Sequence, residues 1–132
     1  LRASGTEAME PVIAQFHCEL AESARSAGDP AAARHHANDA LAVYPRSARA
    51  HLLLGKVARS LGEADTAIRH FEKMAEIDPD FLPEILPDLI RLYEQRGDVP
   101  RAEAFLDLMM QRDRGVGALL ARSAMLERSR GS

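Results

Sequence analysis

The chain has 132 residues, of which 46% are hydrophobic and 28% charged, and its formal net charge is −3. This length suffices for one domain with a core, and the slightly acidic balance argues against nucleic-acid binding, which basic domains usually carry. One cysteine, Cys18, excludes an internal disulfide and a Cys-rich metal site. No stretch approaches the roughly 20 apolar residues of a membrane helix, so we expect a soluble chain. Because it begins at Leu1 instead of Met, we expect it to belong to a longer protein.

Proline and glycine recur along the chain with a common period. Pro11, Pro45 and Pro79 are each separated by 34 residues, as are Gly28 and Gly62. A period of this length predicts stacked helix–turn–helix units. The predicted divisions are 1–13, the end of a preceding unit or a linker; 14–47, 48–82 and 83–116, three units; and 117–132, the first helix of a truncated fourth unit.

Each unit should contain two helices joined by a tight turn. The predicted helices are 14–27, 30–43, 48–61, 64–77, 84–96, 99–113 and 117–130. Asp29 and Asp98 are candidate N-caps of second helices, since a short carboxylate side chain can accept from free backbone N–H groups. Pro87 should kink or delay its helix. The turns need a positive φ, which glycine adopts at least cost, and this assigns them to Gly28, Gly62 and Gly97.

The unit that starts at residue 48 shows the repeat signature most clearly. Leu54-Gly55, Ala67, Phe71 and Pro79 fall at the offsets of the L-G, A-x-x-x-F and P positions of the tetratricopeptide repeat. We therefore predict an all-α fold, a right-handed superhelix of antiparallel helix pairs. The residues assigned to the signature are Leu20, Gly28, Ala33, Pro45, Leu54, Gly55, Gly62, Ala67, Phe71, Pro79, Tyr93, Gly97 and Ala102.

Side-chain size explains the signature positions. Small residues such as Gly55 and Ala67 let the two helices of a unit approach closely, and Phe71 is expected to wedge toward the next unit. The leucine at the seventh position of each unit should fill the seam between helices. These leucines are Leu20, Leu54 and Leu89.

The first unit also carries a more specific pattern. Residues 11–21 read PVIAQFHCELA, which resembles the lipopolysaccharide assembly protein B family, whose members read V-x-I-A-H-F-Y-C-E-L-A there. The runs SAR at 47–49, GKV at 55–57 and YEQ at 93–95 are similar too. This resemblance covers nearly the whole chain.

The resemblance implies an N-terminal inner-membrane helix, a repeat array on the cytoplasmic side and a C-terminal rubredoxin-like knuckle that binds iron or zinc. Neither the anchor nor the knuckle lies in this chain, so we expect no cofactor or metal here and membrane contact only through that absent anchor. The resemblance further implies an adaptor whose partners are a deacetylase and a membrane-bound ATP-dependent zinc protease. Such adaptors promote degradation of the deacetylase, which commits precursors to lipid A.

Repeat arrays of this kind bind partners on a concave face formed by the first helix of each unit. Arginine is frequent among the residues expected there, which favours an acidic partner segment because a guanidinium group can hold a carboxylate with two hydrogen bonds. The alternative is that these charges only solvate the face. The expected partner-binding residues are Arg25, Arg49, Leu52, Lys56, Arg59, Arg91 and Glu94.

The sequence does not predict an enzyme. His35 and His36 are adjacent, so their side chains diverge on a helix, and no two histidines have the i, i+4 spacing of a zinc-binding helix. Cys18 lacks a neighbour that would clearly activate a thiol. We expect packing or surface roles for these residues. An adaptor is favoured, a generic repeat module of an unrelated complex is the alternative, and an enzyme centred on Cys18 or the histidines is the third hypothesis.

Overall fold

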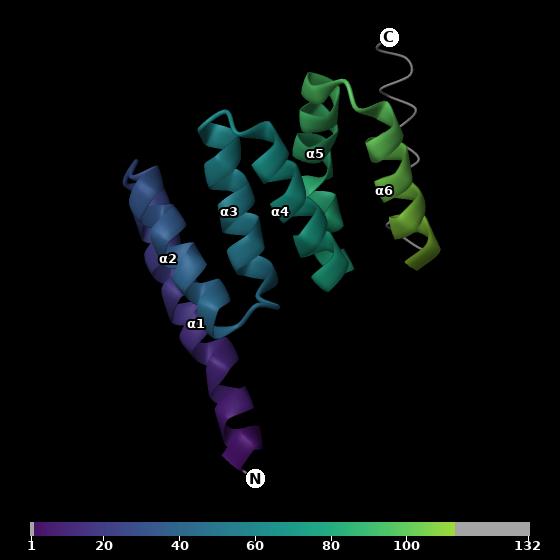
Figure 1. The fold of residues 1–132 in the computed structure, drawn as a ribbon. Helices are drawn as coiled ribbons and strands as arrows, with labels where there is room; N and C mark the ends of the chain where they lie inside the picture. Colours follow the sequence, from purple (N-terminus) through teal and green to yellow (C-terminus); the bar gives the residue numbers. More distant parts are fainter. Residues whose placement is uncertain (1, 113–132) are drawn as a thin grey trace. The chain divides into compact units, whose positions relative to one another are not determined.

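The computed structural model describes residues 2–112, and these residues fold into helices and short connections without any β-strand (Figure 1). The prediction of an all-α fold is therefore confirmed. The chain divides into two compact units, residues 1–77 and residues 78–132. The predicted helix at 117–130 lies outside the described residues.

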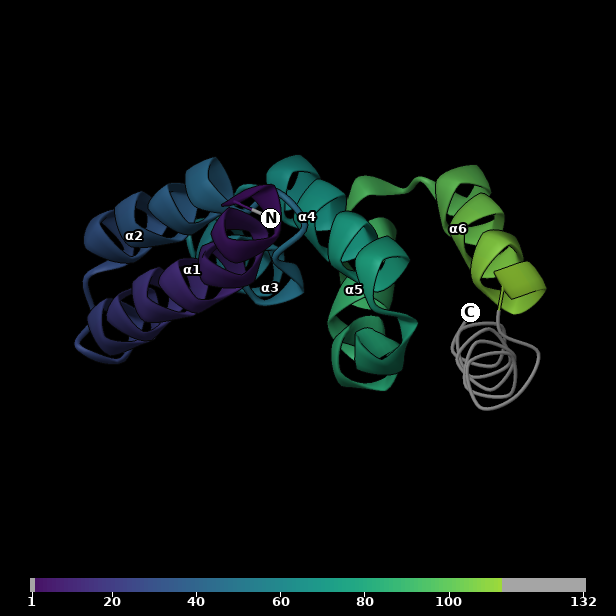
Figure 2. The same ribbon diagram turned by 90° about the horizontal axis from the view of Figure 1, so that it is seen from below.

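The first unit contains four helices, α1 (Arg2–Ser26), α2 (Pro30–Val43), α3 (Ala48–Ser60) and α4 (Ala64–Ile77). Each packs against the next in chain order, and α1 and α3 lie on one side of the unit with α2 and α4 on the other (Figure 2). The core between α1, α2 and α3 is built mainly from alanine, which allows close helix contact. Its buried residues are Ala14, Cys18, Ala21, Ala37, Ala40, Ala50, Leu53 and Leu54.

The second unit begins with a single 3-10 turn, η1 (Pro79–Phe81), followed by α5 (Leu82–Arg96) and α6 (Val99–Arg112). The sequence predicted that Pro87 would kink or delay the first of these helices, but α5 starts two residues before the predicted position and continues through Pro87. Pro87 is exposed, whereas Leu86 and Leu89 beside it are buried. Packing of that apolar face offsets the hydrogen bond that proline cannot donate.

The largest departure from the predicted elements is the start of α1. Residues 1–13 were expected to be a linker or the end of a preceding unit, yet α1 is continuous from Arg2 and includes Pro11. Its N-terminal part extends beyond the end of α2 (Figure 1). Alanine, glutamate and methionine, which favour helices, are frequent in this segment.

Local turn and cap chemistry agrees with the sequence. The three turn glycines have φ values of 81°, 77° and 65°. The Ala32 N–H donates to Asp29 over 3.1 Å, and the Arg101 N–H donates to Asp98 over 3.2 Å. An additional cap was not predicted: Ser47 accepts from the Ala50 N–H at the start of α3, over 3.1 Å.

The signature residues divide according to their surroundings. A Cβ atom at Gly55 would lie 2.6 Å from the Phe71 ring, so Phe71 packs on the glycine of its own helix pair. Leu54 and Leu89 are buried as predicted, with 3% and 0% of their surface exposed. Leu20, predicted to fill the equivalent seam, is 37% exposed, because no helix among the described residues covers that face of α1.

Candidate partner-binding surface

Charged side chains of α1 and α3 form a network on the side of the first unit opposite α2 and α4. Arg25 donates two hydrogen bonds to Glu22, from Nη2 over 2.7 Å and from Nε over 3.1 Å. Arg49 Nη1 reaches Glu19 Oε1 over 2.5 Å and so joins α3 to α1. We name this surface the α1–α3 charged face; it consists of Glu19, Glu22, Arg25, Arg49 and Lys56.

Electrostatics show that the cations of this face lie close enough to act together. The pKa of Glu22 is lowered, first by its hydrogen bond from Arg25 and further by the charges of Lys56 and Arg49, against the opposing effect of burial. The structure thus brings together three residues that the sequence assigned to the concave face: Arg25, Arg49 and Lys56.

The charge balance of the face differs from the strongly basic one that was predicted. Three cations stand against the two carboxylates Glu19 and Glu22, which leaves one positive charge, and two of the cations already hold ion pairs. Exposed ion pairs of this kind contribute little stability, about 0–1 kcal/mol each. A partner's carboxylate could therefore displace them at small cost, but the attraction toward acidic segments is weaker than the sequence indicated.

Leu52 does not belong to this surface. It was expected to contact a partner, but only 7% of its surface is exposed, because a leucine side chain gains more by packing inside the fold than by facing solvent. Cys18 is likewise buried in the core, with its Sγ 3.8 Å from Ser47 Oγ. Burial raises the pKa of the Cys18 thiol despite the Ser47 contact and the Arg49 charge, which makes it a poor nucleophile.

The remaining predicted binding residues are exposed. Arg59 lies near the end of α3. Arg91 and Glu94 lie on α5, in the second unit, where Arg91 Nη1 is 4.0 Å from Asp88 Oδ1. The predicted surface is thus divided between the two units.

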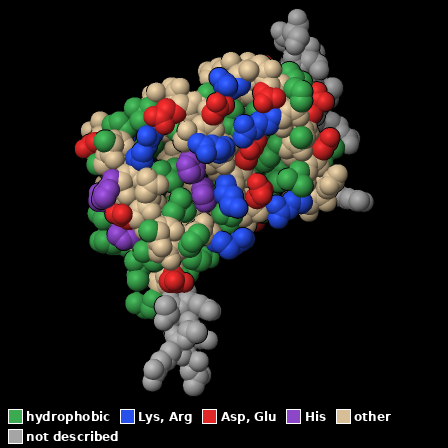
Figure 3. All heavy atoms as spheres, viewed as in Figure 1, with side chains coloured by type: hydrophobic (Ala, Val, Ile, Leu, Met, Phe, Trp, Pro, Cys, Tyr) green, Lys and Arg blue, Asp and Glu red, His purple; other side chains and the backbone are tan. Residues whose placement is uncertain are grey.

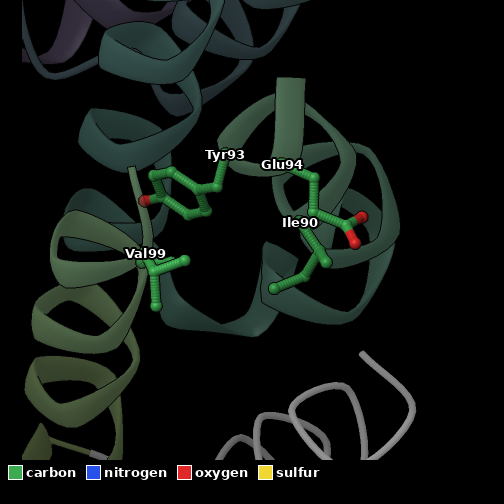
Figure 4. Close-up of a pocket in the computed structure, with 5 residues that line it drawn as sticks. Ile90, Tyr93, Glu94 and Val99 are labelled. Atoms are coloured by element: carbon green, nitrogen blue, oxygen red, sulfur yellow. The ribbon is translucent and has the colours of Figure 1, made fainter. Parts of the chain in front are cut away.

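A shallow pocket lies between α5 and α6 of the second unit (Figure 4). It is lined by Ile90, Tyr93, Glu94, Val99 and Ala102, and its surface is almost entirely apolar. The empty volume is about 200 Å³ with open solvent included, below the roughly 300–1,000 Å³ of typical small-molecule sites. It does not have the size or the polar groups of a cofactor site.

Comparison with known families decides the class of this fold. Two tetratricopeptide-repeat family models match the chain, one over residues 18–80 and one over residues 58–123. The second of these covers half of the chain. The chain belongs to the tetratricopeptide-repeat family.

Curated relatives of this repeat chain carry one name. It is 34% identical over 97 residues to Lipopolysaccharide assembly protein B of Haemophilus influenzae, an alignment that covers 71% of this chain and 24% of the relative. It is 27% identical over 128 residues to the protein of the same name from Escherichia coli K12, covering 97% of this chain and 33% of the relative. The resemblance predicted from the sequence is confirmed, and the chain spans about a quarter to a third of these relatives' length.

Several functional features of these tetratricopeptide repeats could not be found from motifs. The Glu19–Arg49 pair joins residues 30 positions apart on different helices, and the only signal was the repeat register that places α1 beside α3. Within residues 2–112, no three histidine, cysteine, aspartate or glutamate side chains come together as a metal site. The helices in the same range include none long and apolar enough to cross a membrane.

Proposed function

We propose that this chain is the protein-binding region of an adaptor that acts in lipopolysaccharide assembly. The observation that carries the proposal is that similarity to Lipopolysaccharide assembly protein B extends over 97% of the chain, in register with tetratricopeptide repeats. Repeats of this class provide extended surfaces for other proteins, and this role requires no catalytic residue in the chain.

The α1–α3 charged face is the surface proposed to bind the partner. Its side chains are held in defined positions by the Arg25–Glu22 and Arg49–Glu19 pairs, so that little side-chain entropy is lost on binding. Lys56 is partly exposed and adds a positive charge to the same face. A partner segment with a carboxylate positioned toward Lys56 would complement it.

At the level of the longer protein, we propose that the adaptor promotes proteolysis of the deacetylase that commits precursors to lipid A. The protease would be the membrane-bound ATP-dependent zinc protease, and the adaptor would act on the cytoplasmic side of the inner membrane. This part of the proposal rests on the family resemblance of the repeat region.

The test is capture of these two proteins by the full-length adaptor, with Lys56→Glu as the variant. We expect the wild type to retain the deacetylase or the protease, and Lys56→Glu to weaken retention and its dependence on salt, since charges at an interface act mainly through screened attraction. Failure of the wild type to retain either protein would instead favour a repeat module of an unrelated complex.

The matched control is Arg69→Glu, an equal charge reversal at an exposed position of α4. Arg34 on α2 is unsuitable for this purpose, because Arg34 Nη2 donates to Glu63 Oε1 over 2.7 Å and its reversal would break that link. Loss of capture in Arg69→Glu with full capture in Lys56→Glu would assign binding to the α2 and α4 side.

A further inference from the structure

Two histidines from different helices face each other within the second helix pair. Nδ1 of His51 on α3 lies 3.1 Å from Nδ1 of His70 on α4, and the ring centroids are 5.3 Å apart with an interplanar angle of 34°. His51 is buried and His70 is half-buried. In the view from the α2 and α4 side, histidine side chains reach the surface of the first unit (Figure 3).

A backbone group orients the first ring. The Pro45 carbonyl accepts a hydrogen bond from the His51 ring. With Nδ1 turned toward His70, the donating atom is Nε2, and the lone pair of Nδ1 then points at His70. Histidines that bind metal ions usually donate their second ring N–H to a carbonyl or carboxylate in this way, which fixes the tautomer.

Both rings are neutral at physiological pH, which is the form that coordinates metal. Burial lowers the pKa of His51. Burial also lowers the pKa of His70 to about 4, and the neighbouring His51, Arg69 and Arg34 lower it further. Proton competition for these nitrogens is therefore weak at neutral pH.

The separation of the two nitrogens suits a shared ion. A tetrahedral zinc ion binds imidazole nitrogens at about 2.0–2.1 Å, which places two such ligands roughly 3.3–3.4 Å apart. The observed 3.1 Å needs only a small opening of the pair. We propose that His51 and His70 chelate a borderline divalent cation such as Zn²⁺, with water completing its coordination.

Neighbouring cations set the strength of this site. Lys73 acts on His51, and Arg69 and Arg34 act on His70, so an incoming cation is repelled. The charge of Arg34 is balanced by Glu63 at 2.7 Å, and Arg69 and Lys73 are exposed and screened by solvent. Lys73→Gln should accordingly tighten zinc binding.

The first helix pair supplies an internal comparison. His17 and His36 precede His51 and His70 by 34 residues, but His17 Nδ1 is buried without a hydrogen-bond partner and the His36 ring lies against His35, with centroids 5.6 Å apart. His35 also lies 3.4 Å from Asp39 on the exposed side of α2. This surface group is the natural competitor for added zinc.

The experiment is a zinc titration of the 132-residue chain by calorimetry, with the imidazole nitrogens followed by NMR. We expect one saturable site that shifts the Nδ1 signals of His51 and His70. His70→Gln should weaken it at least about tenfold, in the range that changes around a metal site produce, while the double variant His35→Gln/His36→Gln retains it. Circular dichroism of each variant confirms that the helices remain.

Acidity separates the two histidine groups further. Because the pKa of His70 is about 4, zinc affinity at the His51–His70 pair should change little between pH 7.5 and pH 6, whereas ordinary surface histidines titrate near 6.5. The proposal is overturned if His70→Gln binds zinc as tightly as the wild type, if His35→Gln/His36→Gln abolishes binding, or if no saturable binding occurs.

Discussion

The helices α1 and α3 occupy equivalent places in successive repeats, and the same face is exposed on one and buried on the other. Leu20 of α1 is 37% exposed, whereas Leu54, 34 residues later, is 3% exposed. Phe16 is 60% exposed, and its equivalent Ala50 is fully buried. The exposed face of α1 continues through Met9, Val12, Ile13, Phe16 and Leu20.

This difference separates two kinds of contact in a repeat protein. Contacts within a helix pair are made by each repeat for itself, so Ala33 and Ala67 are both buried. Contacts between pairs exist only where a neighbour is present, so α3 is covered by α1 and α2 while the corresponding face of α1 is open. The repeat signature thus specifies the first kind, and the array specifies the second.

The largest effect is expected from removing a leucine that only the array buries. Leu54→Ala should lower the free energy of unfolding by about 2–5 kcal/mol, the cost of a cavity in a packed core. Leu20→Ala should lower it by less than about 1 kcal/mol, because that side chain keeps much of its solvent contact. Urea unfolding of both variants measures the difference, and equal losses would show that the two faces are equally packed.

Contacts within a pair should respond alike in both repeats. Ala67→Leu and Ala33→Leu each insert bulk between paired helices and should destabilise the chain by about 1–3 kcal/mol, the usual cost of overpacking. The exposed Arg69→Leu is the control and should be nearly neutral; His70 cannot serve, although the sequence placed it on the surface, because it is half-buried against His51. Thermal unfolding of the three variants checks this, and an effect of Ala67→Leu no larger than that of Arg69→Leu would contradict it.

Acid should destabilise the second helix pair through His70. Its folded pKa of about 4 lies below the unfolded value near 6.5, so the unfolded chain binds more protons between these values and stability falls as pH decreases through this window. We expect His70 to account for a loss on the order of 1 kcal/mol between pH 7 and pH 5.

The measurement for this effect is the free energy of unfolding against pH for the wild type, His70→Gln and His36→Gln, the equivalent residue in the first pair. The slope between pH 5 and pH 6.5 should become shallower in His70→Gln alone. An unchanged slope in that variant would assign the acid sensitivity to other groups.

The smallest effect is expected at the ion pair that joins α1 to α3. Glu19→Gln removes the charge that Arg49 pairs with and should cost about 0.2–1 kcal/mol, diminishing at high salt. Glu22→Gln, which breaks a pair confined to α1, is the matched comparison. A double-mutant cycle with Arg49→Ala isolates the link between helices, and a coupling energy of zero would show that α1 and α3 are held by apolar contacts alone.

Determinants that act within one turn of chain could be predicted from the sequence. Asp29 caps α2 because its side chain reaches an N–H three residues away, and the turn glycines adopt a positive φ because no other residue does so at low cost. Helices α2 and α4 have the predicted limits. The 34-residue period carried the family assignment for the same reason, since it records residue type at fixed local offsets.

Tertiary structure alone decided which side chains meet across helices. Leu20 and Leu54 are the same residue at the same repeat position, so no local pattern distinguishes the exposed one from the buried one. Arg49 is paired because α1 lies beside α3, which reduced the basic face that was predicted. His51 and His70 were tested for motifs along single helices, where they form none, and they converge only because Gly55 and Ala67 let α3 and α4 pack closely.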